Sequence, residues 1–177
     1  MSRLKVLVVG LSVVSVAAFS GCAGSVPSAA FSKPLAESYR ICQTDEATVK
    51  LVVADGVPVD ETSRKRLEDQ ILGHVNLKKS VAQCKTTEKR SFVLNSKITT
   101  YEEGSAFARL MMAGLGQMHI DGDFTLSLLP ENKETLAAFS ASKTFAWGGA
   151  YGYSTNLYDI EGAFFESVAD AVVTPAP

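Results

Sequence analysis

The side chains best suited to metal or ligand chemistry are His119, Asp121 and Asp123, which alternate with apolar residues along one segment. Residues two apart in a β-strand point to the same face, with about 7 Å between their Cβ atoms. One imidazole and two carboxylates on one face suit a divalent cation when further ligands come from elsewhere in the fold. The same pattern is also typical of the solvated face of an amphipathic strand, so both interpretations stay open.

Catalysis by a nucleophile needs a neighbouring base that a third group orients. His74 falls late in a predicted helix and His119 on a polar strand face, and the sequence supports no serine or cysteine partner for either. The segment Gly114-Leu115-Gly116 leads into a strand, whereas a phosphate-binding loop leads into a helix. We therefore predict that the protein is not an enzyme and carries no cofactor.

The first of the three cysteines, Cys22, follows Phe19-Ser20-Gly21 and resembles the lipidated cysteine of the bacterial lipobox. Arg3 and Lys5 precede an apolar stretch, residues 6–19, that is shorter than the ~20 residues of a membrane-spanning helix. The resemblance implies a lipoprotein signal peptide over residues 1–21, cleavage before Cys22 and acylation of its thiol. An uncleaved membrane span is the alternative.

The residue after Cys22 is Ala23 rather than aspartate, which by the same resemblance favours the bacterial outer membrane, with the protein facing the periplasm. In that oxidising compartment the remaining pair, Cys42 and Cys84, is predicted to form a disulfide. Two buried free thiols are the alternative, since cysteine packs well as a small apolar residue. The spacing is not that of a zinc site, because it contains neither Cys-x-x-Cys nor a nearby histidine pair.

The length and charge of the chain set the broad class. The 177 residues carry 17 lysines and arginines against 19 acidic residues, and removing Arg3 and Lys5 with the signal gives 15 − 19 = −4. A chain of this size and balance is expected to form one domain that does not bind nucleic acid. We place a lipidated, flexible tether at residues 22–40 and the folded domain at residues 41–174.

The periodicity within the domain predicts an α+β fold, a mainly antiparallel sheet with two helices packed on one face. Leu67, Ile71 and Val75 recur every four residues and mark one helix face. Strict alternation from Met118 onward predicts a half-buried strand, and a following strand with Phe139 and Phe145 on one face completes a hairpin. The expected strands are residues 48–54, 91–101, 118–128 and 135–147, and the expected helices are 60–75 and 157–171.

Two segments carry apolar side chains without a clear period. The run 107–115, rich in methionine and leucine, either packs on the sheet or contacts a partner or a membrane. A glycine-rich segment carries the aromatics Trp147, Tyr151, Tyr153 and Tyr158, which suit recognition on a loop and equally suit packing on the last helix.

The order Tyr101-Glu102-Glu103-Gly104-Ser105, then Arg109, then Gly114-Leu115-Gly116, then a long alternating strand resembles a bacterial lipoprotein family, the domain of unknown function 4410. The resemblance covers residues 50–172 and implies an envelope lipoprotein with an α+β domain and no established activity. Members of that family carry a glycine, an arginine and Gly-x-Gly before a strand, so by this resemblance Arg109 is the one charged residue of the family motif and a candidate partner contact. The alternative for Arg109 is an ion pair or a carbonyl contact within the glycine-rich bend.

These observations together predict an outer-membrane lipoprotein that binds an envelope protein or a cell-wall partner, with the membrane as a further partner through its lipid. The candidate partner-binding residues are Trp147, Tyr151, Tyr153, Tyr158 and Arg109. The alternative function is a periplasmic module that binds a small ligand or a metal through His119, Asp121 and Asp123.

Overall fold

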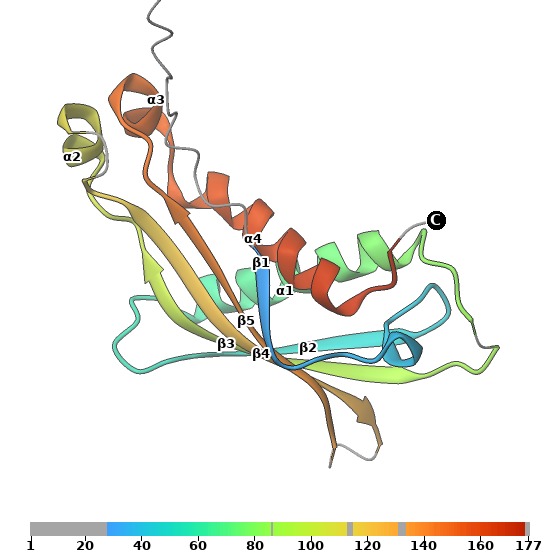
Figure 1. The fold of residues 1–177 in the computed structure, drawn as a ribbon. Helices are drawn as coiled ribbons and strands as arrows, with labels where there is room; N and C mark the ends of the chain where they lie inside the picture. Colours follow the sequence, from blue (N-terminus) through green and yellow to red (C-terminus); the bar gives the residue numbers. More distant parts are fainter. Residues whose placement is uncertain (1–27, 86, 113–114, 131–133, 176–177) are drawn as a thin grey trace, which may run out of the picture.

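The computed structural model describes residues 28–85, 87–112, 115–130 and 134–175. They form a five-stranded sheet in the order β1-β5-β4-β3-β2, with helices on one side of it (Figure 1). The strands are β1 (Ser28–Lys33), β2 (Glu46–Val53), β3 (Ser91–Glu102), β4 (Met118–Leu129) and β5 (Thr135–Phe145). The helices are the 3-10 turn η1 (Glu37–Tyr39), α1 (Glu61–Lys79), α2 (Ala106–Met111), α3 (Gly149–Ser154) and α4 (Leu157–Val172).

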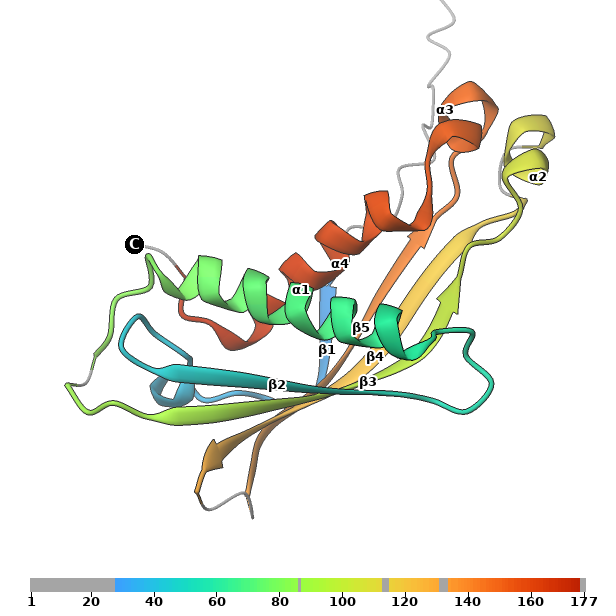
Figure 2. The same ribbon diagram turned by 180° about the vertical axis from the view of Figure 1, so that it is seen from behind.

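The long helices α1 and α4 lie side by side over the same face of the sheet, which leaves the other face open (Figures 1 and 2). Helix α1 begins where the Asp60 side chain accepts a hydrogen bond from the Ser63 backbone N–H at 2.7 Å. Its buried face consists of Leu67, Ile71 and Val75, as predicted. No helix in the described part of the chain is long and apolar enough to cross a membrane.

The fold is α+β and the sheet is mostly antiparallel, but it is mixed, because β2 and β3 run parallel. Adjacent parallel strands need a long crossover connection, and α1 supplies it between β2 and β3. At the free edge of β2, side chains of α1 also form hydrogen bonds with the backbone of Leu51. The N–H of Leu51 donates to Glu68 and its carbonyl accepts from Arg64, each at 2.9 Å. These contacts block strand addition at this edge.

The core lies between the sheet and the two long helices. The predicted alternation of β4 is confirmed from Met118 to Leu126, since Met118, Ile120, Phe124 and Leu126 are all buried. It ends there, because the register with β5 shifts between Leu126 and Ser127 and Ser127 is also buried. The Phe124 ring stacks on Phe139 of β5 with centroids 5.2 Å apart and meets Phe164 of α4 at 6.1 Å. The inner face of the sheet and α4 are therefore joined by aromatic contacts from three elements.

The boundary between tether and domain, predicted at residue 41, is wrong. Residues 28–33 form the edge strand β1, which pairs antiparallel with β5 from Ser28 opposite Ser142 to Lys33 opposite Ala138. Leu35, within the predicted tether, is also buried. The free edge of β5 supplies the hydrogen bonds that a local pattern could not predict. The predicted signal peptide and Cys22 lie outside the described residues.

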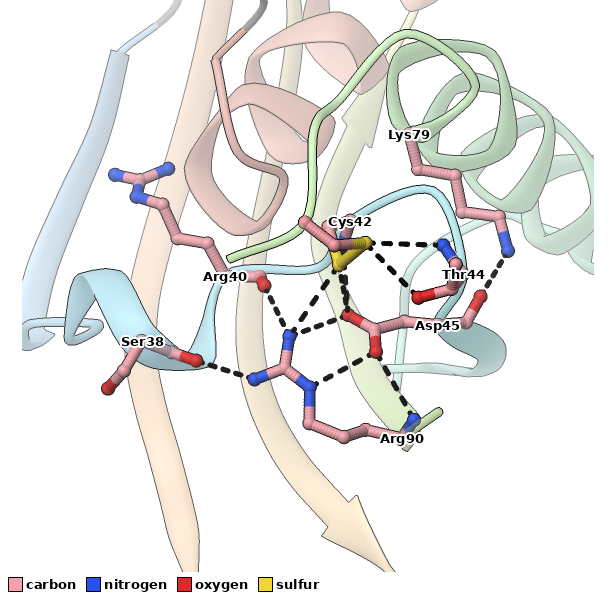
Figure 3. Close-up of a disulfide and its surroundings, with 8 residues drawn as sticks. Ser38, Arg40, Cys42, Thr44, Asp45, Lys79 and Arg90 are labelled. Atoms are coloured by element: carbon pink, nitrogen blue, oxygen red, sulfur yellow. Dashed lines mark hydrogen bonds and ion pairs between the residues drawn. A yellow bond between two sulfur atoms is a disulfide. The ribbon is translucent and has the colours of Figure 1, made fainter. Parts of the chain in front are cut away.

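The predicted disulfide between Cys42 and Cys84 is confirmed, and it stands beside a buried carboxylate (Figure 3). The carboxylate of Asp45 accepts from the Cys42 backbone N–H at 2.9 Å and from the Arg90 backbone N–H at 3.2 Å. The Arg90 guanidinium donates to both Asp45 oxygens, at 3.1 and 2.7 Å. Arg90 also donates to the carbonyls of Ser38 and Arg40. This cluster ties the segment before β2 to the start of β3.

Replacing Cys42 and Cys84 together with serine is expected to lower the free energy of unfolding by about 4 kcal/mol, because the bridge closes a loop across a sequence separation of 42 residues. Chemical denaturation followed by circular dichroism measures this loss. The same loss should appear when a reductant is added to the unmodified protein. An unchanged denaturation midpoint under both conditions would contradict the prediction.

Candidate interaction surface

The short helices α2 and α3 lie against each other at one end of the sheet (Figures 1 and 2). Helix α2 sits in the connection from β3 to β4, and its first turn is capped by the Ser105 hydroxyl, which accepts from the Ala108 backbone N–H at 3.2 Å. Helix α3 sits in the connection from β5 to α4. Two connections far apart in the sequence therefore form one structural unit, which sequence analysis did not predict.

Arg109 of α2 holds this unit together. Its side chain is only 2% exposed, and its guanidinium donates to four backbone carbonyls. The Nε donates to Gly152 at 2.8 Å, Nη1 to Glu103 at 2.8 Å and to Gly116 at 2.7 Å, and Nη2 to Thr155 at 3.2 Å. We call this arrangement the arginine clamp. The prediction of Arg109 as a direct partner contact is wrong, because it is buried, and the carbonyl-contact alternative is confirmed.

Two motif glycines let the backbone close around the clamp. Gly104 has φ +63°, and a Cβ there would lie 2.1 Å from the carbonyl oxygen of Gln117. Gly116 has φ +67°, and a Cβ there would lie 2.3 Å from the carbonyl oxygen of Ser105. Any other residue would push apart the two ends of the β3–β4 connection. The motif Gly–Arg–Gly therefore encodes one local structure. Its signal in the sequence is a single arginine between glycines in a stretch otherwise without charge.

The outer side of the α2–α3 unit is apolar and exposed. Phe107, Met111 and Tyr151 are 68%, 64% and 62% exposed, respectively. The described apolar residues of the run 107–115 are therefore exposed and do not pack on the sheet, and their contact with a partner or a membrane stays a prediction. We define the end surface as the exposed apolar and aromatic side chains of this unit, namely Phe107, Leu110, Met111, Met112, Leu115, Trp147, Tyr151 and Tyr153.

Two aromatic side chains of the end surface, Trp147 and Tyr151, form ring contacts that reach Phe145 of β5. Trp147 meets Tyr151 edge to face with centroids 5.9 Å apart, and Tyr151 meets Phe145 at 5.8 Å. A hollow of about 360 Å³ lies beside them and is bordered by Lys143 and Asp159. Burial lowers the pKa of the Lys143 ammonium. Two charged residues, Lys143 and Asp159, therefore border the end surface at this hollow.

The fourth predicted aromatic, Tyr158, belongs to a different neighbourhood. The Arg66 guanidinium lies over its ring at 4.6 Å and forms a bidentate ion pair with the buried Glu161, at 2.5 and 2.9 Å. The Tyr101 hydroxyl donates to the same carboxylate at 2.5 Å. Burial, and then this bond to Glu161, raise the pKa of Tyr101. These contacts join α1, β3 and α4. Tyr158 itself is 63% exposed, so its contact role stays a prediction at a place separate from the end surface.

The three residues of the predicted metal site do not gather as ligands. Nε2 of His119 lies 2.6 Å from an Asp121 oxygen, and Nδ1 lies 2.6 Å from the Thr144 hydroxyl, so both ring nitrogens have partners. Asp123 is exposed further along β4, opposite Lys97 of β3. Within the described ranges, no group of three or more histidine, cysteine or acidic residues is placed to hold a metal ion.

The fold and the clamp define the class of this protein: an α+β domain whose motif residues form the base of an exposed end surface. The family model for a domain of unknown function, DUF4410, matches residues 59–149, which is just over half of the chain. The chain therefore belongs to the DUF4410 family. The matched segment contains Gly104, Arg109 and Gly116, three of the residues that form the clamp.

The fold is also similar to that of solved structures. A PelC dodecamer from Paraburkholderia phytofirmans aligns with a TM-score of 0.52 and 9% identity, covering 83% of this chain and 98% of that one. A single-residue variant of the same PelC dodecamer aligns with a TM-score of 0.53 and 10% identity over the same shares. At this identity the likeness concerns the fold alone. Among curated proteins, none matches the sequence significantly.

Proposed function

We propose that this protein is a cell-envelope lipoprotein, anchored through Cys22 at the outer membrane, that acts by binding rather than by catalysis. The observation that carries the proposal is the end surface: exposed apolar side chains held on a rigid base by the buried Arg109. Exposed apolar patches of this kind mark contact sites for proteins or membranes. The disulfide between Cys42 and Cys84 supports an oxidising compartment outside the cytoplasm.

The anchor is tested on the protein isolated from a bacterial envelope. We expect mass spectrometry to find a mature chain that begins at Cys22 and carries acyl groups on that residue. Replacing Cys22 with serine should leave the precursor uncleaved, because the lipidating enzymes act on the thiol. An intact, unmodified amino terminus on the unaltered protein would overturn the anchor.

The contact role is tested in cells with a photo-crosslinking residue at single positions. We expect adducts from position 111 or 151 on the end surface. Position 77 is the matched control, because Leu77 is 70% exposed and belongs to the C-terminal part of α1. That end of α1 lies far from α2 and α3 (Figure 2). Equal yields from all three positions, or none from the end surface, would contradict a contact role. The PelC likeness makes a second copy of this chain one candidate partner.

A further inference from the structure

The end surface is almost free of charge. Segments 104–117 and 144–158 contain one charged residue between them, Arg109. That residue is buried and its donors are used by carbonyls of the protein itself. Moving these two segments out of water would therefore strip no exposed ionised side chain of its hydration, which is the largest cost of such a transfer. The charged residues Glu102, Glu103, Lys143 and Asp159 flank the two segments and mark a border.

The chain enters the fold at this same end. In the antiparallel pairing of β1 with β5, Ser28 lies opposite Ser142, three residues before the end of β5, while Lys33 lies toward the opposite end. Helix α3 follows directly after β5. Cys22 precedes Ser28 by six residues, a span of at most about 20 Å when fully extended. An acyl group on Cys22 therefore holds the end surface, and no other end of the domain, within reach of the bilayer.

The side chains are of the kinds found where proteins meet lipid. Tryptophan and tyrosine combine an apolar ring with one polar atom and concentrate at the headgroup level, while phenylalanine, leucine and methionine suit the acyl region. Trp147, Tyr151 and Tyr153 supply the first kind, and Phe107, Met111 and Met112 supply the second. The arginine clamp also satisfies the carbonyls of Gly152 and Thr155 internally, which reduces the unpaired backbone presented to lipid.

We propose that the end surface inserts into the interfacial layer of the bilayer to which Cys22 is anchored. This inference rests on the proposed function and names the lipid surface as the partner of the α2–α3 unit. The acyl chain and the end surface together attach the domain to the bilayer at two places. Two attachments fix the orientation of the domain relative to the bilayer. The open face of the sheet and the helices α1 and α4 then stand away from the lipid.

The sequence provides its own probe, since Trp147 is the one tryptophan of the chain. The full-length protein is expressed with its signal, purified, and reconstituted into vesicles of phosphatidylethanolamine and phosphatidylglycerol. With lipid brominated near the headgroup end of the acyl chains, we expect at least about a twofold loss of Trp147 emission, because interfacial helices bury their apolar face about 5–10 Å deep. Iodide in the aqueous phase should quench the same emission only weakly.

Two pairs of substitutions test the cause. Replacing Phe107 and Met111 with serine removes exposed apolar area without touching Trp147, and should abolish the quenching by brominated lipid and restore quenching by iodide. Replacing Leu77 and Val81 with serine is the matched control, because these are 70% and 60% exposed but lie on α1 and just after it. The control pair should leave both signals unchanged.

The outcomes separate this inference from the proposed function. Acylated Cys22 with a Trp147 that iodide quenches fully and brominated lipid does not would overturn membrane insertion and leave the anchor standing. An unmodified Cys22 would overturn the anchor, and the bromine signal would then report separately on the end surface. A Trp147 blue shift that follows protein concentration without lipid would assign the surface to a second copy and overturn the lipid assignment.

Discussion

Replacing Arg109 with methionine is expected to lower the free energy of unfolding by about 4 kcal/mol, because hydrogen bonds to a charged donor contribute about 1.5–3 kcal/mol each and the four are not additive. Methionine fills a similar volume but donates to none of the carbonyls of Glu103, Gly116, Gly152 and Thr155 that now face the guanidinium. These carbonyls converge from two connections. Their mutual repulsion is expected to separate α2 from α3 and to leave the sheet in place.

The variant Arg109→Lys separates the effect of the positive charge from the effect of the hydrogen-bond geometry of the guanidinium. Its ammonium keeps the charge but lacks the planar fork that reaches carbonyls on several sides. We therefore expect Arg109→Lys to be destabilised by roughly half as much as Arg109→Met. Lys65→Met is the control, since Lys65 is exposed on α1 and should change the stability little.

Two measurements check the clamp. Thermal unfolding gives the stability, and hydrogen exchange should show protection lost first in residues 104–117 and 148–156 while β3, β4 and β5 keep theirs. The same variant should lose the membrane contact of the end surface. Exchange that rises evenly over the whole sheet, or Arg109→Lys as stable as the unmodified protein, would refute the clamp as the base of that surface.

The long elements of this fold were predictable because their patterns are local. Leu67, Ile71 and Val75 share a helix face at any position in space, and Met118, Ile120 and Phe124 share a strand face in the same way. The parallel pairing of β2 with β3 was missed, although strand, helix and strand in succession favour it. Strand β1 had no local signal, since its place depends on the unpaired edge of β5.

The site was predictable in composition but not in arrangement. The apolar run at 107–115 and the aromatics at 147–153 were identified as candidates, yet nothing in their spacing brings α2 beside α3. Their meeting depends on Arg109, whose four partners are backbone carbonyls, and carbonyls are present at every residue and leave no trace in a sequence. For the same reason the sequence grouped Tyr158 with the other aromatic residues, because its contact with Arg66 crosses from α4 to α1 and leaves no local pattern.

Replacing Asp45 with alanine is expected to cost about 4 kcal/mol and to lower the melting temperature by about 10 °C, since breaking a buried ion pair typically costs 3–5 kcal/mol. The Asp45 side chain is fully buried, and four donors converge on its two oxygens. Without it, Arg90 keeps its bonds to the carbonyls of Ser38 and Arg40 but carries an uncompensated charge beside the disulfide (Figure 3).

The neighbouring residue offers a control for this experiment. Glu46 pairs with Lys89 at 2.6 Å, but both side chains are more than half exposed, so Glu46→Ala should leave the melting temperature unchanged within error. A cycle with Arg90→Met isolates the pair. If Asp45 and Arg90 act together, the double variant loses less stability than the sum of the single losses, because neither charge is then left buried alone. Additive losses would show that each residue acts through its backbone contacts and that the ion pair contributes nothing of its own.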